Sequence, residues 1–316
     1  MIKSKKIFIT GLNGSIAKSF IILLEKKNKK SKIYVSSRSN IKKIDNNNIK
    51  VIKLNKYYSN IENYQKIINE CDYFFHLAYQ NSEAFAEKYP YEDFKTNVQS
   101  LMKILKIVQN NKKLTFVFTS TVSIYKTSKK KINEKSKIQS LSVYNFHKHC
   151  CENLIRLYSF FSKNKFIILR LSNVYGDDDD KKRDFLLQCI KNIKNRKSIN
   201  IYGNGKYYRD FIHIDDVSSA LLKIVEKNKI TRFNIYNICS GFSITIRDLI
   251  NLLIKTYSKV KFDNNIKIRF SKNNTKLTKR NFFAKPIKFM NEFSWKPKIK
   301  LSNGVLNLIK RISDSL

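Results

Sequence analysis

Glycine is scarce in this sequence, with 7 among 316 residues. A chain of this length would carry about 22 at the usual frequency of roughly 7%. Because glycine is not used here for ordinary turns, we expect the few that occur to mark backbone positions that require it. Six of the seven form four short clusters: Gly11 with Gly14, Gly176, Gly203 with Gly205, and Gly241.

Long apolar runs are also absent. No stretch approaches the roughly 18 apolar residues that a membrane span requires, and residues 1–6 lead into strand-like sequence without the apolar region of a signal peptide. We therefore expect a cytoplasmic protein with no membrane partner. The five cysteines contain no C-x-x-C pair and no metal-ligand spacing with the four histidines, so neither disulfides nor a metal site are expected.

Acidic residues are few, with 24 against 63 lysines and arginines, which gives a formal net charge of +39. Such an excess can indicate a nucleic-acid partner. Here, however, the lysines are spread over every segment, and the densest run, at 126–137, is typical of a solvated loop. We therefore expect no nucleic-acid partner, although a positive field would attract polyanionic small molecules.

Short apolar runs alternate with stretches of helical periodicity over the first half of the chain. The pattern predicts strands at 6–10, 33–36, 50–54, 73–77, 114–119 and 166–171, and helices at 15–27, 61–69, 91–109 and 144–161. Such alternation is typical of an α/β protein with a doubly wound parallel sheet. In these folds ligands bind at the carboxyl ends of the strands.

After residue 171 the rhythm loosens into loop-rich segments. Helices are predicted near 185–194, 215–226 and 246–257, a strand at 233–238 and a helical C-terminal end. We expect residues 1–171 to form a dinucleotide-binding domain to which 210–240 returns. Residues 172–209 and 241–316 would form a smaller lobe that binds the substrate.

The loop at residues 10–17 reads T-G-L-N-G-S-I-A and lies between the first predicted strand and the first predicted helix. Glycines there let the backbone approach a pyrophosphate, whose charge is met by the amides of the following helix. The alternative is a merely tight turn. The position of the loop favours a dinucleotide, with Gly11, Asn13, Gly14, Ser15 and Ile16 contacting it.

The end of the second predicted strand bears on the choice of cofactor. About 20 residues after the glycine loop, NAD-binding folds place a carboxylate on the adenine ribose. This strand instead ends with Ser37 and Arg38. An arginine accommodates the 2′-phosphate of NADP, so we favour NADP over NAD. The alternative is that Arg38 is an ordinary surface arginine.

Tyr144 and Lys148 are four residues apart and so share one face of a predicted helix. A neighbouring ammonium would lower the pKa of the phenol and make it a general acid/base. Five tyrosines have a lysine at this spacing, so the spacing alone selects none of them. Tyr144 stands out because it opens a long helix after the hydroxyl-rich strand end F-T-S-T-V-S-I-Y at 118–125.

With these motifs in order, the whole chain resembles the extended short-chain dehydrogenase/reductase family, the NAD(P)-dependent nucleotide-sugar epimerases and dehydratases. The resemblance implies a Rossmann-like doubly wound parallel sheet with a smaller C-terminal α/β substrate lobe. Further matching segments are C-D-Y-F-F-H-L-A at 71–78, T-N-V at 96–98, R-L-S-N-V-Y-G at 170–176, G-N-G at 203–205, R-D-F-I-H-I-D-D at 209–216, Y-N-I-C-S-G at 236–241 and W-K-P at 295–297.

The resemblance also implies roles for individual residues. Tyr144 would be the acid/base, Lys148 would hold the nicotinamide ribose and tune Tyr144, and Thr121 would orient the sugar oxygen. Beyond these three, Leu77 and Ala78 would line the cofactor site, and Asn173, Arg209 and Arg280 would contact the nucleotide diphosphate. A homodimer packed through the helices at 91–109 and 144–161 is the implied assembly.

Departures from the family pattern reduce the number of reactions that the chain could catalyse. Dehydratases carry Asp-Glu directly after the threonine, where this chain has Val122 and Ser123, so a 4,6-dehydratase would lack its acid and base. Two reactions stay open: reduction of a 4-keto nucleotide sugar, which Ser37 and Arg38 favour, and 4-epimerisation. A binding protein without catalysis is a third reading, against which the intact Thr121, Tyr144 and Lys148 argue.

Overall fold

The computed structural model describes residues 4–38, 46–111, 113–128, 130–176, 185–227, 229–261, 268–271 and 281–314. Contacts between Cα atoms divide the chain into two units. Unit 1 contains Met1–Ile124, Ser140–Leu171 and Ser218–Tyr236, and unit 2 contains Tyr125–Gln139, Ser172–Val217 and Asn237–Leu316. Residues 125–139, expected in the first domain from the sequence, thus group with unit 2.

A seven-stranded sheet forms the centre of unit 1, and its strand order is β10-β6-β5-β4-β1-β2-β3. The pairings of β1 with β2 and β4, of β2 with β3, and of β5 with β4 and β6 are all parallel. The predicted doubly wound parallel sheet is therefore confirmed. Its strands are β1 (Lys6–Thr10), β2 (Lys32–Ser37), β3 (Ile49–Lys53), β4 (Tyr73–His76), β5 (Thr115–Thr121), β6 (Lys165–Leu171) and β10 (Phe233–Ile238).

The strand order reverses direction at β1 and β4, which are neighbours in the sheet but far apart in sequence. On one side the chain continues through β2 and β3, and on the other through β5 and β6. Such a switch point leaves the carboxyl ends of the two central strands uncovered by a crossover helix, and ligands bind there in doubly wound folds.

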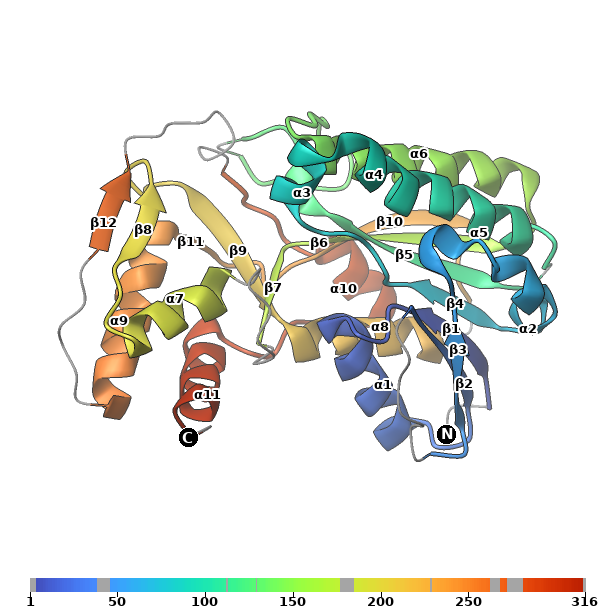
Figure 1. The fold of residues 1–316 in the computed structure, drawn as a ribbon, viewed down its shortest axis with the longest axis horizontal. Helices are drawn as coiled ribbons and strands as arrows, with labels where there is room; N and C mark the ends of the chain where they lie inside the picture. Colours follow the sequence, from blue (N-terminus) through green and yellow to red (C-terminus); the bar gives the residue numbers. More distant parts are fainter. Residues whose placement is uncertain are drawn as a thin grey trace. The chain divides into compact units, whose positions relative to one another are not determined.

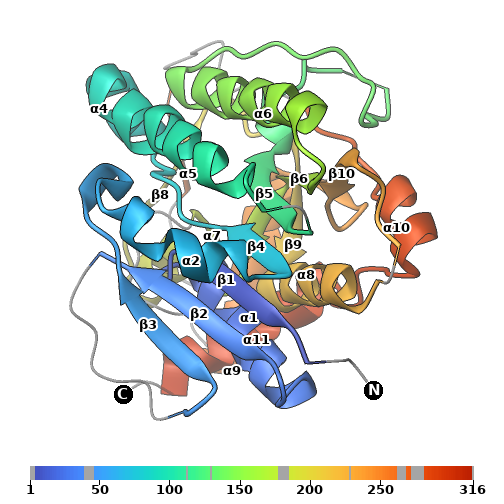
Figure 2. The ribbon, with the colours of Figure 1, turned by 90° about the vertical axis from the view of Figure 1, so that its right-hand side faces the viewer.

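Helices cover both faces of this sheet (Figures 1 and 2), with α2, α4, α5 and α6 on one face and α1 and α8 on the other. Strands buried on both faces must be apolar throughout, which explains the continuous runs in β1, β4 and β5. The bounds are α1 Ser15–Lys27, α2 Gln65–Asn69, α3 Glu83–Lys88, α4 Pro90–Phe94, α5 Ser100–Val108, α6 Val143–Phe161 and α8 Ile214–Glu226.

The helix predicted at 91–109 is interrupted. Its first part is α4, its last part is α5, and between them Lys95–Gln99 (η3) form a π-helical turn. The buried Asn97 side chain in this turn bonds to Gln80, outside the helix, and to Asp93 on α4. Helical periodicity does not encode the contact with Gln80. Short 3-10 turns occur at η1 Lys56–Tyr58, η2 Ile61–Tyr64 and η4 Val122–Ile124.

Unit 2 contains a three-stranded sheet of order β11-β9-β7, a β12-β8 pair and four helices among its described residues. Its core joins apolar residues of α7, α9 and α11, such as Ile190, Leu253 and Leu308. The sequence predicted α7 and α9 but not the short strands. The elements are β7 Asn173–Tyr175, α7 Phe185–Lys194, β8 Ile199–Tyr202, β9 Tyr208–His213, β11 Ser243–Thr245, α9 Ile246–Lys261, β12 Ile268–Ser271, α10 Ile287–Phe293 and α11 Leu301–Asp314.

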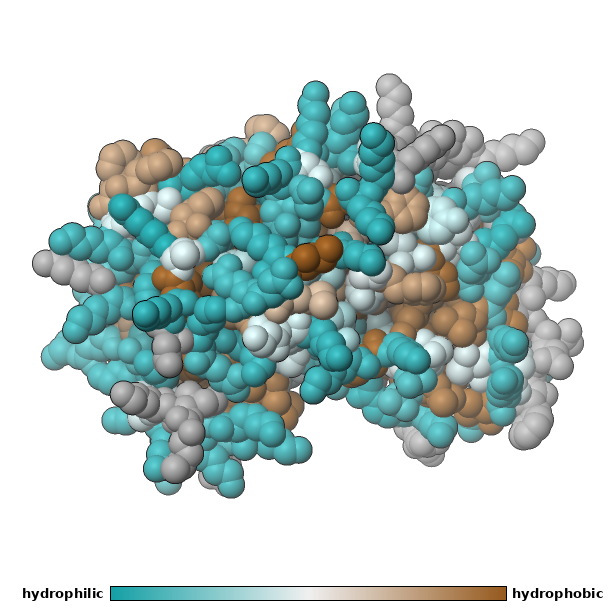
Figure 3. Space-filling view, turned by 180° about the vertical axis from the view of Figure 1, so that it is seen from behind, coloured by the Kyte–Doolittle hydropathy of each residue, from teal (hydrophilic) through white to brown (hydrophobic). Residues whose placement is uncertain are grey.

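Hydrophilic side chains project over most of the face that Figure 3 shows, and hydrophobic residues lie between them in small groups. This distribution is expected when lysines are spread through the whole sequence. Among the described helices, none combines the length and the apolar character that crossing a lipid bilayer would take.

A buried ion pair ties α6 to the sheet of unit 1. Arg170 on β6 donates from Nη2 to Glu152 Oε2 over 2.6 Å and from Nε to Oε1 over 3.0 Å, and both side chains are almost fully buried. Removing one partner leaves an uncompensated charge away from water. We expect Glu152→Ala to lower the free energy of unfolding by about 3–5 kcal/mol, as measured by urea denaturation.

Glu70→Ala is the matched control, because Glu70 forms a single 2.7 Å ion pair with Lys6 in solvent. Solvent and salt screen such a pair, so this variant should unfold at nearly the wild-type urea concentration. Equal losses in the two variants would contradict a special role for burial.

Candidate active site

The glycine turn lies at the switch point, between β1 and α1. Gly11 has a φ of +90°, and a Cβ there would lie 2.9 Å from the Cα of Ala78, so the turn leaves no room for a side chain. The amide of Gly14 donates to the carbonyl of Gly11 over 2.7 Å. The N-cap residue of α1 is Gly14, which has no side chain to bond the first amides of the helix. The positive end of a helix attracts an anion.

These features fit the pyrophosphate of a dinucleotide, which needs close backbone approach and amide donors. Gly11, Asn13 and Gly14 form the turn, and Ser15 and Ile16 begin α1. All five predicted residues thus lie where they could hold the cofactor.

A buried histidine joins the ends of the two central strands. His76 Nδ1 on β4 lies 2.9 Å from the hydroxyl of Thr10 on β1, which accepts a hydrogen bond from the Ala78 amide over 3.2 Å. Burial, with a contribution from the charge of Lys148, lowers the pKa of His76 to about 3, so the ring is neutral. This contact holds Leu77 and Ala78 next to the glycine turn.

At the end of β2, Ser37 is buried and Arg38 is exposed. Arg38 lies near Tyr58, a residue that the sequence analysis did not single out. Burial raises the pKa of Tyr58 to about 12, while a hydrogen bond with Thr10 and the charge of Arg38 act in the opposite direction. Tyr57 and Tyr58 both have left-handed φ values, 57° and 52°. Nothing in the periodicity of the sequence signals this backbone.

Thr121 ends β5, and its hydroxyl is fixed from two directions. Ser123 donates its amide to Thr121 Oγ1 over 3.1 Å, and the two hydroxyl oxygens are 2.9 Å apart. The Ser123 hydroxyl also donates to Asn145 Oδ1. Because Asn145 follows Tyr144 on α6, this chain links the Thr121 hydroxyl to the start of that helix.

Helix α6 begins after Ser142, whose side chain accepts from the amide of Asn145 over 3.2 Å and caps the helix. Tyr144 and Lys148 lie on α6, one turn apart. The Lys148 ammonium donates to the carbonyl of Thr119 on β5 over 2.7 Å. Lys148 thus contacts β5 directly, the Thr121 hydroxyl reaches α6 through Ser123, and the Tyr144 ring lies against Tyr79.

Burial has the largest effect on the pKa values of Lys148 and Tyr144. It lowers the pKa of Lys148 to about 7, against the opposing effects of Cys151, Glu152 and Asp93. It also raises the pKa of the Tyr144 phenol well above its usual value, with Glu83 and Asp93 adding to the effect. The sequence predicted the opposite direction for Tyr144, because it considered the charge of Lys148 without the loss of solvent.

Asn173 and Arg209 lie in unit 2, on the neighbouring strands β7 and β9. The Asn173 amide donates to the carbonyl of Asp210 over 2.8 Å. The Arg209 guanidinium lies over the rings of Tyr207 and Phe282, with centroid distances of 4.8 and 5.3 Å. Arg280, the third predicted phosphate contact, lies outside the described residues.

A parallel sheet with a glycine turn at its switch point and a Tyr-Lys helix after β5 defines a dinucleotide-dependent α/β enzyme class. Residues 7–239 match the model of the NAD dependent epimerase/dehydratase family. The chain therefore belongs to this family of enzymes, which confirms the resemblance inferred from the motifs.

The chain is also similar to individual proteins of known name. It is 28% identical over 270 residues to a dTDP-D-glucose 4,6-dehydratase of Dictyostelium discoideum, a match that covers 79% of this chain but 62% of the relative. A UDP-N-acetylglucosamine 4-epimerase from Methanobrevibacter ruminantium has the same fold, with a TM-score of 0.85, 21% identity and coverage of 99% and 100% of the two chains.

The UDP-glucuronic acid 4-epimerase of Bacillus cereus, solved with UDP-glucuronic acid and NAD, is also similar. The TM-score is 0.84, the identity is 22%, and the match covers 97% of this chain and 99% of the other. These structural likenesses establish the fold.

Proposed function

We propose that the protein reduces a 4-keto nucleotide sugar, with Tyr144 as the proton donor, Lys148 as its partner and Thr121 as the group that orients the sugar oxygen. The observation that carries this proposal is that Thr121 and Lys148 both lie at the end of β5, while Tyr144, one helical turn before Lys148, is a buried and neutral phenol. A neutral phenol can donate a proton, which reduction of a carbonyl requires.

When bound, the nicotinamide cofactor would supply the hydride that C4 of the sugar accepts. Thr121 would turn its one hydroxyl proton, which it donates to Ser123 Oγ in this structure, to the C4 oxygen. Tyr144 would transfer its phenolic proton to that oxygen as negative charge develops. The Lys148 ammonium stabilises the resulting phenolate. We assign the binding of the cofactor pyrophosphate to Gly11, Asn13, Gly14, Ser15 and Ile16. The rest of the cofactor would contact Leu77, Ala78, Ser37 and Arg38. The diphosphate of the sugar nucleotide would contact Asn173, Arg209 and Arg280.

A 4-epimerase is the second candidate, because the Bacillus cereus neighbour is named as a 4-epimerase in complex with NAD. In an epimerase, Tyr144 would first accept the proton of the C4 hydroxyl and later return it. A dehydratase is less well supported, since Val122 is buried and apolar and Ser123 already bonds to Thr121 and Asn145.

Replacing Tyr144 with Phe tests the proton donor. We expect the rate of NADPH oxidation with dTDP-4-keto-6-deoxyglucose to fall about 100- to 10,000-fold, while binding of NADPH, followed by fluorescence, stays unchanged. An absorbance assay at neutral pH measures the rate. Tyr91→Phe is the control, because Tyr91 has the same spacing to a lysine, Lys95, whose ammonium lies 4.3 Å from its ring.

Unchanged turnover in Tyr144→Phe would refute the mechanism. If the wild-type protein instead interconverts UDP-glucose and UDP-galactose without net oxidation of a nucleotide, the 4-epimerase is the correct reaction.

Arg38 tests the preference for NADP. The exposed guanidinium at the end of β2 suits a 2′-phosphate through charge-assisted hydrogen bonds. We expect Arg38→Ala to weaken NADPH binding by about 10- to 100-fold and NADH binding very little, as measured by fluorescence titration. Lys32→Ala removes an exposed charge from the other end of β2 and is the control. Equal weakening of both nucleotides, or tight NAD copurifying with the wild type, would count against NADP.

We also propose a homodimer formed through α4, α5 and α6. In unit 1, large apolar side chains on these helices are exposed to solvent, an arrangement that marks interaction surfaces. On α6 three of them recur at positions that share one face of the helix. The exposed residues are Tyr91, Phe94, Met102, Phe146, Leu157, Phe160 and Phe161.

Leu157→Glu places a charge on this surface, and we expect it to convert a dimer into a monomer in size-exclusion chromatography with light scattering. Ile22→Glu is the control, since Ile22 is exposed on α1, which covers the opposite face of the sheet. A wild-type monomer, or a dimer that survives Leu157→Glu but not Ile22→Glu, would contradict this interface.

A further inference from the structure

Tyr79 follows directly after the β4 segment that contacts the glycine turn, and its ring lies against Lys148. The Lys148 ammonium is 3.3 Å from the centroid of the Tyr79 ring and 4.7 Å from that of Phe118. The Tyr79 ring also meets Tyr144 edge-on, at a centroid distance of 5.9 Å and an angle of 87°. One side chain thus contacts both residues of the Tyr144-Lys148 pair.

The backbone beside Tyr79 is fixed by Asn97. The amide of Gln80 donates to Asn97 Oδ1 over 2.8 Å, and Asn97 Nδ2 donates back to the carbonyl of Gln80 over 3.1 Å. The π-helical turn Lys95–Gln99 contains Asn97, which is 2% exposed. Two reciprocal bonds to one residue hold the loop after β4 in a single position.

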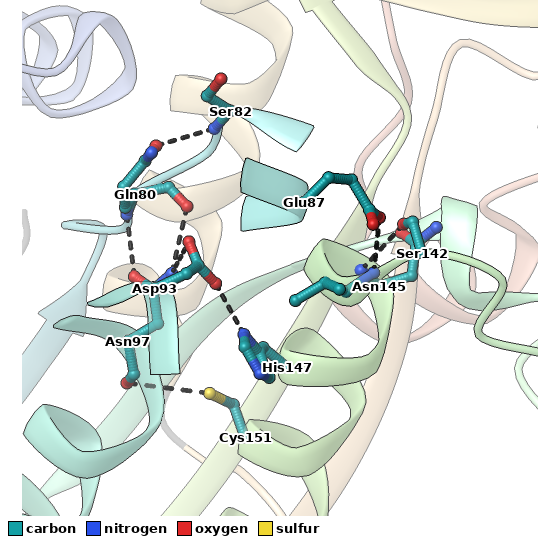
Figure 4. A network of polar contacts seen from close by, with 10 residues as sticks. Gln80, Ser82, Glu87, Asp93, Asn97, Ser142, Asn145, His147 and Cys151 are labelled. Atoms are coloured by element: carbon teal, nitrogen blue, oxygen red, sulfur yellow. Dashed lines mark hydrogen bonds and ion pairs between the residues drawn. The ribbon is translucent and has the colours of Figure 1, made fainter. Parts of the chain in front are cut away.

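The same asparagine connects to α6 through a carboxylate (Figure 4). Asn97 Nδ2 donates to Asp93 Oδ1 over 3.0 Å, and Asp93 Oδ2 lies 2.7 Å from His147 Nδ1. The sulfur of Cys151 lies 3.9 Å from the carbonyl of Asn97. We refer to Gln80, Asn97, Asp93 and His147 as the Asn97 network.

A buried ammonium needs partners on every side that water would otherwise occupy. Lys148 donates a hydrogen bond to the Thr119 carbonyl. The face of the Tyr79 ring provides a second favourable contact, because the ring quadrupole attracts a cation most strongly away from solvent. Burial raises the pKa of the Tyr79 phenol, so the ring itself stays neutral.

The other titratable groups around Lys148 come from three elements. Cys151 and Glu152 lie on α6, Asp93 lies on α4, and all three favour the ammonium. Glu152 is paired with Arg170 of β6, and the neutral His76 faces Lys148 from β4. Of the two aromatic rings that contact the ammonium among the described residues, that of Tyr79 is the nearer.

We propose that Tyr79 is a positioning residue that keeps the Lys148 ammonium charged on the face of its ring, which also contacts Tyr144, and that the Asn97 network fixes Tyr79 for this purpose. This proposal rests on the proposed function in one respect, which is that Lys148 takes part in catalysis. The contact itself is independent of which sugar is reduced.

The test follows the ionisation of Lys148 directly, in protein labelled with ¹³C at the lysine ε-carbons. Lys148 is expected to titrate near neutrality, and Lys148→Met identifies its resonance by removing it. Tyr79→Leu deletes the ring and should lower the titration midpoint by about one pH unit, a tenfold change, because the ammonium loses its aromatic partner. Tyr79→Phe retains the ring and should keep the wild-type midpoint.

Phe116→Leu is the matched control, since it removes a fully buried ring from β5 that packs on Phe74 and Phe166. It should reduce stability without moving the midpoint. If Tyr79→Leu does not fold, Tyr79→Met replaces it, because methionine fills a similar volume without a ring.

An unchanged midpoint in the variants without the ring would overturn the proposal, as would equal shifts in Tyr79→Phe and Tyr79→Leu. NADPH binding, followed by fluorescence, gives a second measure, and we expect about tenfold weaker binding in Tyr79→Leu. If the midpoint moves as expected but the wild type reduces no 4-keto sugar, Tyr79 holds Lys148 as proposed and the proposed reaction is wrong.

Discussion

The burial of one lysine constrains the arrangement of everything around the end of β5. An ammonium removed from water is unfavourable unless carbonyls, carboxylates or aromatic faces replace the lost hydration. For Lys148 the replacements come from β5, from the loop after β4 and from carboxylates on α4 and α6. These elements must pack in one relative position for the lysine to remain charged, so the packing of this region and its chemistry depend on the same contacts.

Much of the fold of unit 1 could be predicted because its signals are local. The apolar runs of β1 and β10 and the periodicity of α1 predicted their exact bounds. Parallel pairing then followed from the alternation of strands with helices. The glycine turn could be placed because Gly11 has a conformation that other residues adopt poorly.

The parts that could not be predicted depend on contacts between distant residues. The π-helical turn around Asn97 is stabilised by bonds to Gln80, 17 positions earlier. Tyr79 is one of 17 tyrosines, and only the folded chain shows its ring against Lys148. The raised pKa of Tyr144 follows from burial, which a spacing of four residues does not reveal. Strands of three residues such as β7 and β11 are too short to show a period.

Two consecutive residues of α6 are contacted from this region: His147 by Asp93 of the Asn97 network, and Lys148 by the Tyr79 ring beside that network. Consecutive residues point about 100° apart around a helix axis, so α6 is held from two directions. Turning the helix either way about its own axis would strain one of these contacts. These two contacts therefore fix the rotation of α6 about its axis, and with it the direction of the Tyr144 side chain. The side chains that make them do not have to touch the sugar or the nucleotide.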